Sequence, residues 1–194
     1  GYIAKGGGAM PHRVQPRVEG AVLILLIAAI VLTPVQSSWS AVAAGVVLTT
    51  AGALTGFRWL RWGPWRCRHR PNLVALLIGY LWLAIGLILM GLAHFIPGMP
   101  AQAATHAITA GALGTLTLTV MMRTRLLYRF RDANRFMLAH IAVVFVNLAA
   151  LCRVIPPFVG TDWNWLEIAA GWWALAMLCG LVVIARTIKK KAER

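Results

Sequence analysis

Six apolar runs divide this chain, and they constrain its fold more than any other feature. They cover residues 19–36, 40–57, 73–96, 101–122, 136–155 and 163–185. Each is close to the length of about 20 residues that an α-helix needs to cross the core of a bilayer. The composition agrees, because 60% of the residues are apolar and 12% are charged, against about 45–50% and 25% in soluble domains. The sequence therefore predicts an all-α integral membrane bundle of about six transmembrane helices.

The Lys and Arg residues occur only in alternate connections, with one exception. Of the 19 in the chain, all but Arg153 fall in the leading segment, the second and fourth connections and the tail. The first and third connections, residues 37–40 and 97–100, carry no charge. Because short cytoplasmic loops carry an excess of Lys and Arg, this pattern predicts that both termini are cytoplasmic.

The net charge of +14 follows from this topology. Basic cytoplasmic loops meet anionic lipid headgroups, so we expect membrane lipids as partners and no nucleic acid. The expected division is a linker or N-terminal segment (1–18), a six-helix domain (19–186) and a basic cytoplasmic tail (187–194). Because the chain begins with Gly rather than Met, we expect a fragment, a processed product or a chain given without its earlier residues.

One stripe of the fourth run combines a histidine with small residues. His106, Ala110, Gly114 and Thr117 recur at i, i+4, i+8 and i+11, which places them on one face of a regular α-helix. A flat cofactor held by His106 could lie along Gly114. Small residues at this spacing are also the usual signal for a close helix in membranes, and spacing alone favours that reading.

Arg153 opposes the charge asymmetry of the chain. Counting 1.5 Å per residue from the nearest cytoplasmic Arg places Arg153, His106 and Glu167 in one layer, about 25–29 Å from the cytoplasmic edge. A guanidinium group stays charged, so it needs an anionic partner inside a membrane. Two interpretations stand equally: an ion pair with Glu167, or contact with an anion such as a haem propionate.

Two further histidines are candidate ligands. His140 lies near the cytoplasmic edge, about 17–20 Å from His106 in depth, which is too far for the two to hold one metal ion. It could ligate a separate centre or be an interfacial, hydrogen-bonded histidine. His94 and His106 flank a tight connection close to Met90 and Met99, and imidazole with thioether suits copper, although histidines at helix ends are commonly interfacial.

Three stretches resemble the bacterial NnrS family. They read GYLWLA at 79–84, ATHAITAGALGTLTLTVMMR at 104–123 and AALCRV at 149–154. The resemblance covers about residues 58–185 and corresponds to the C-terminal half of longer family members. It implies a haem- and copper-containing, multi-pass protein of the bacterial cytoplasmic (inner) membrane, linked to nitric-oxide metabolism and nitrosative stress. Its further partners would be a missing N-terminal half or other membrane subunits.

Carried onto these motifs, the resemblance ties His106 and Arg153 to the cofactor. His106 would be the axial ligand of the haem, and Arg153 would meet the propionates. His94 and His140 lie outside the motifs. We therefore expect a haem-binding protein of the nitric-oxide response, with a haem-dependent redox activity as one option.

The alternative function comes from a different class. A non-catalytic scaffold or accessory subunit would pack its Gly and Ala stripes against a larger complex. In that case Gly111 or Gly114 replaced by Leu would break assembly, whereas His106→Ala would leave it intact. Transport is the least favoured function, because few polar groups lie at the expected midplane.

Overall fold

The computed structural model describes residues 16–35, 37–160 and 164–189, which form helices and no strand. The elements are α2 (Pro16–Leu32), α3 (Ser38–Arg61), η1 (Pro64–Cys67), α4 (Pro71–Leu92), α5 (Ala101–His106), η2 (Ala107–Gly114), α6 (Thr115–Phe130), α7 (Met137–Val154), α8 (Pro156–Val159) and α9 (Asn164–Lys189). The prediction of an all-α fold is confirmed. Most of the predicted leading segment and tail lies outside the described residues.

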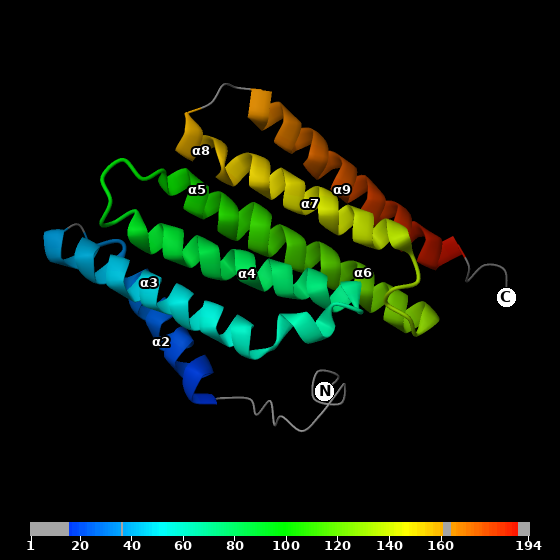
Figure 1. Ribbon diagram of the computed structural model, residues 1–194, viewed down its shortest axis with the longest axis horizontal. Helices are drawn as coiled ribbons and strands as arrows, with labels where there is room; N and C mark the ends of the chain where they lie inside the picture. Colours follow the sequence, from blue (N-terminus) through cyan, green and yellow to red (C-terminus); the bar gives the residue numbers. More distant parts are fainter. Residues whose placement is uncertain (1–15, 36, 161–163, 190–194) are drawn as a thin grey trace.

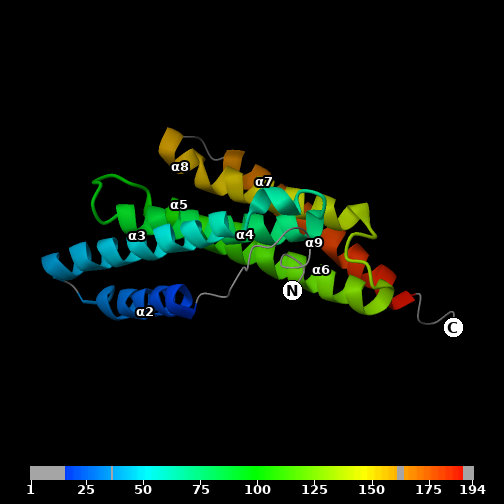
Figure 2. The same cartoon turned by 60° about the horizontal axis from the view of Figure 1, so that its bottom comes forward.

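The long helices lie side by side in chain order (Figure 1). α2 packs on α3, α3 on α4, α4 on the continuous α5–η2–α6 helix, and that helix on α7. α9 packs on α7 and also contacts α6. In Figure 2, α2 lies beside α3 and away from α7 and α9. The connections rich in Arg, around η1 and between α6 and α7, lie at the same end of the bundle (Figure 1).

Five helices are long and apolar enough to cross a membrane. They are Ser38–Arg61, Pro71–Leu92, Ala101–Phe130, Met137–Val159 and Asn164–Ile188, and they correspond to the second to sixth predicted runs. α2 corresponds to the first run, but its 17 residues are fewer than the 18 taken here as the shortest helix that spans a membrane. The count of six and the cytoplasmic termini stay predictions.

α6 extends further than the apolar run predicts. Arg123 and Arg125 lie on this helix rather than in a connection, and it continues to Phe130. The reason is that its apolar face continues as well, because Leu126 is completely buried in a core shared with α4, α7 and α9. The helix ends at Arg131, whose φ of 56° lies in the left-handed region that cannot continue an α-helix.

The fourth span is not the regular α-helix that the stripe assumed. Its middle third, η2, is a π-helix, in which the hydrogen bonds run from residue i to i+5. α4 approaches this segment very closely. A Cβ atom on Gly86 would lie 2.5 Å from Ile108 Cγ1, and one on Gly111 would lie 2.6 Å from Trp82 Cδ2. Two glycines that face each other's helix therefore allow the contact between α4 and η2.

A polar pair joins α4 to α7 inside the bundle. Trp82 Nε1 donates a hydrogen bond to Asn147 Oδ1 at 2.8 Å, and Asn147 Nδ2 donates to the Val143 carbonyl at 2.7 Å. Polar groups within a membrane have no water to bond, so they are satisfied by such pairs. The pair fixes the position of α7 relative to α4.

Candidate functional site

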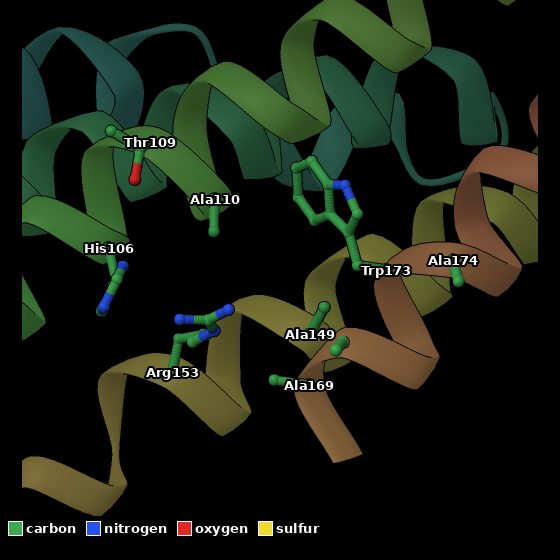
Figure 3. A pocket seen from close by; sticks show the side chains of 9 residues that line it. His106, Thr109, Ala110, Ala149, Arg153, Ala169, Trp173 and Ala174 are labelled. Carbon is green, nitrogen blue, oxygen red and sulfur yellow. The ribbon is translucent and has the colours of Figure 1, made fainter. Parts of the chain in front are cut away.

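A pocket of about 420 Å³ lies between the α5–η2 segment, α7 and α9. Its lining consists mainly of small apolar side chains with one imidazole, one guanidinium and one indole (Figure 3): His106, Thr109, Ala110, Ala149, Arg153, Ala169, Ala170, Trp173 and Ala174. Ligand pockets for small molecules and cofactors typically measure about 300–1,000 Å³ and are mostly apolar with few polar groups. The size and lining of this pocket match that description.

His106 and Arg153 face the same space from different helices (Figure 3). His106 is the last residue of α5, immediately before the π-helical segment. Arg153 lies at the end of α7, which stops before Pro156 because proline cannot continue the hydrogen-bond pattern. Both side chains are half-buried. The structure thus brings together the two residues that sequence reasoning linked most strongly to a cofactor.

The ion pair with Glu167, one of the two interpretations of Arg153, is not formed. The ion pair found in the described part of the chain joins Arg58 Nη2 to Glu19 Oε1 at 2.7 Å, and Glu167 is exposed. Glu167 lies in the first turn of α9, before the residues of this helix that line the pocket.

Within the described residues, no acidic side chain therefore pairs with Arg153. Its guanidinium remains charged at any physiological pH, and it lines a largely apolar pocket. Such a cation is costly in a membrane unless an anion neutralises it. The pocket is consequently suited to a ligand with a negatively charged group.

Gly114 does not line this pocket, in contrast to the predicted stripe. Ala110 of the stripe does line the pocket, together with Thr109. Gly114 lies behind the indole of Trp173, whose Cη2 atom would be 2.6 Å from a Cβ on Gly114. Its contribution is indirect, because it lets the Trp173 ring form one wall.

The glycines that the scaffold alternative requires are covered by the chain itself. Gly114 packs on Trp173 of α9, and Gly111 packs on Trp82 of α4. A partner helix has no access to either glycine in this packing. No observation therefore favours the scaffold over a ligand-binding function.

The other two candidate histidines lie elsewhere. His94, just beyond α4, is exposed, and its Cβ would be 2.9 Å from a Cβ on Gly45 of α3. His140 lines a separate small cavity, and its Nε2 atom lies 3.4 Å from Asn134 Oδ1. Among the residues that the structure describes, no three His, Cys, Asp or Glu side chains are grouped as metal ligands.

The family model described as NnrS protein matches residues 3–190. The chain belongs to the NnrS family. The match extends beyond residues 58–185, where the motifs lie, and covers nearly the whole chain. No curated protein and no solved structure matched the chain. The recognition of the NnrS family is confirmed, and the matched region of this NnrS protein includes His106 and Arg153.

Sequence reasoning missed the walls of the pocket in this NnrS protein. Ala149 precedes Arg153 by four residues, so its position on the same face of α7 could have been found from helical spacing. Ala169 and Trp173 are also four residues apart on α9. Nothing in their residue types separates them from the many other Ala and Trp residues that pack membrane helices.

Proposed function

We propose that this chain binds haem in the pocket between η2, α7 and α9 and acts in the nitric-oxide response at the bacterial inner membrane. His106 would be the axial ligand, and Arg153 would pair with the propionates. One observation carries the proposal. The mostly apolar pocket is lined by the imidazole of His106 and by the guanidinium of Arg153, which has no acidic partner among the described residues.

The residues present fit the chemical requirements of haem. A haem iron takes as little as one axial side chain from the protein, and histidine is a common one. The absence of a three-residue metal cluster among the described residues is therefore compatible with haem. The propionates are anions that match the charge of Arg153, and the alanines and Trp173 supply apolar surface for the porphyrin.

Each pocket residue has a defined role in this proposal. A bound haem iron supplies an open position for a small diatomic ligand such as nitric oxide. His106 holds and orients the group, and Arg153 neutralises its charge. Trp173 and the small residues of α7 and α9 exclude water, which keeps the electrostatic interactions in the pocket strong.

The described residues do not support copper at His94. The prediction placed copper near His94, His106, Met90 and Met99, but His94 packs toward α3 whereas His106 faces α7 and α9. We therefore assign copper to none of these residues. Metal analysis of the purified protein would detect it independently.

The test is an optical spectrum of the detergent-purified protein, oxidised and dithionite-reduced, with and without nitric oxide. We expect a Soret band that shifts with nitric oxide and is lost in His106→Ala. His69→Ala, which replaces an exposed histidine outside the pocket, is the matched control and should keep the band. Arg153→Gln should retain less haem than Arg153→Lys, because Lys keeps the charge.

Three results would contradict the proposal. The first is a colourless wild-type protein that stays colourless after haem is added. The second is a Soret band that survives His106→Ala unchanged. The third is equal haem loss in His106→Ala and His69→Ala, which would trace the loss to general instability.

A further inference from the structure

A second, much smaller cavity lies between the start of α4, the middle of α6 and the start of α7. Its volume is about 20 Å³, and its lining includes Asn72, Thr119, Arg123 and His140. We infer that it is an internal water site that holds one ordered water molecule. The site is separate from the pocket proposed for haem, because it lies toward the other end of the α5–η2–α6 helix from His106.

Thr119 supplies the first reason. Several other threonines in the described helices donate to the carbonyl four residues earlier, as Thr55 does to Ala51 at 2.7 Å and Thr117 does to Leu113 at 2.7 Å. Thr119 makes no such bond, although it is only 3% exposed. Buried Thr115 also makes no such bond, but it does not line this cavity. A buried hydroxyl without a partner costs about 1–3 kcal/mol, so its environment needs a polar group that the side chains do not provide.

Two more atoms around the same cavity lack partners. Asn72 Oδ1 and Arg123 Nε are buried and make no hydrogen bond, and both residues line the cavity. Unpaired buried groups that line one space are the usual mark of an ordered water. We therefore infer that one water molecule in the cavity bonds all three of these atoms, which come from α4 and α6.

The chemistry of these atoms selects water over an ion. Arg123 Nε–H is a donor, Asn72 Oδ1 is an acceptor and the Thr119 hydroxyl is both. A water molecule can accept from Arg123 Nε–H, donate to Asn72 Oδ1 and bond the Thr119 hydroxyl. An anion would be repelled by the partial negative charge of the Asn72 oxygen. A cation is disfavoured by Arg123.

The size of the cavity sets the number of molecules. A single water needs roughly 10–15 Å³ on the same measure, so a space of about 20 Å³ takes one and not two. The water would link α4 to α6 next to His140 of α7. It would thus give the polar ends of three helices a common hydrogen-bond centre.

Met122 provides a direct probe of this water. It lines the cavity and is only 2% exposed, so hydroxyl radicals from bulk solvent do not reach its sulfur. X-ray radiolysis of a bound water would release a radical beside it and form methionine sulfoxide. The experiment is mass-spectrometric measurement of Met122 oxidation in the full-length protein in lipid nanodiscs.

Three variants make the measurement specific. Thr119→Val keeps the side-chain shape but removes the hydroxyl, and should lower Met122 oxidation several-fold. Thr119→Ser keeps the hydroxyl and should retain the wild-type rate. Thr55→Val removes a buried hydroxyl that already bonds its own helix, so it controls for general loosening and should also keep the wild-type rate.

The outcomes separate the alternatives. If Met122 stays unoxidised in the wild type, the cavity is dry and the inference fails. Equal oxidation in wild type and Thr119→Val would mean that Thr119 holds no water. If chloride concentration controls the oxidation rate, the occupant is an anion and the assignment of water is overturned.

Discussion

Two residues with unusual surroundings define the candidate site at the scale of single side chains. His106 and Arg153 are ionisable groups within apolar runs, and such groups in membrane spans face protein or ligand rather than lipid. This contrast made them detectable from the sequence alone. Helical spacing places Ala110 and Ala149 on the same faces as these two residues, but residue type alone does not mark an alanine as lining a pocket, because alanine is common at helix contacts in membranes.

The prediction at this scale concerns the thermal stability of a Gly114→Ala variant. In Gly114→Ala, the new Cβ would lie 2.6 Å from Trp173 Cη2 and 3.3 Å from Val146 Cγ2. The indole would have to move away from the wall of the pocket, and overpacking of this kind costs about 1–3 kcal/mol. We expect a lower midpoint of thermal unfolding in detergent.

Gly171→Ala is the matched control, because a Cβ on Gly171 meets nothing within 4 Å. Its unfolding midpoint should equal or exceed that of the wild type, since alanine favours the helix. Equal destabilisation by the two substitutions would show that the Trp173 contact is unimportant.

The π-helical segment is the decisive feature at the scale of elements. Sequence periodicity gave the helix from 101 to 122 correctly as a helix, but a period of 3.6 was assumed throughout. A π-helix adds a residue to the turn without any marker in residue type, so only tertiary packing reveals it. The predicted stripe held for His106 and Ala110, whereas Gly114 is covered by the indole of Trp173.

Deletion of Leu113 tests the role of η2. Leu113 is 59% exposed and does not line the pocket, so its removal takes away a residue without taking away a contact there. The segment can return to α-helical bonding, which absorbs the deletion and leaves the faces of α5 and α6 close to their present orientation. We expect a folded protein that is monodisperse in gel filtration.

Deletion of Val120 is the comparison, because this residue is also largely exposed, at 46%, but lies in the regular α-helix α6. A regular α-helix has no extra residue, so it cannot absorb the deletion. The part of the helix before the deletion then rotates by about 100° relative to the part after it, a buried face turns toward lipid, and the protein should aggregate. Aggregation of both deletion variants would contradict the proposed tolerance of η2.

At the scale of the whole molecule, charge and hydropathy were sufficient to predict most of the architecture. The bounds of four of these five helices follow the apolar runs to within about four residues, because Arg residues and turns mark their ends, whereas α6 continues beyond its run to Phe130. What the sequence alone did not give is which helices enclose the pocket. That depends on the crossing of α7 and α9, which many arrangements of Ala and Leu would permit.

Orientation is the prediction that belongs to this scale. In a protein with Cys67, Cys152 and Cys179 replaced by Ala, single cysteines are introduced as Pro97→Cys or His69→Cys. Both positions are exposed, and they lie beyond opposite ends of α4. By the positive-inside rule, a membrane-impermeant maleimide should label the first in intact spheroplasts and the second only after lysis. The reverse pattern would invert the assigned topology.

α9 is less buried than the other spans, and this affects the order in which the pocket forms during synthesis. Only 22% of its most apolar 18-residue stretch is buried, against 39–44% of the corresponding stretches in the other four spans. His106 and Arg153 precede α9 in the chain, so a translating ribosome delivers both before the helix that carries Trp173. Until α9 docks, the future pocket is a half-open groove on α5, η2 and α7. A bulky planar group of the kind proposed here would therefore enter most easily at this stage, before α9 closes the groove.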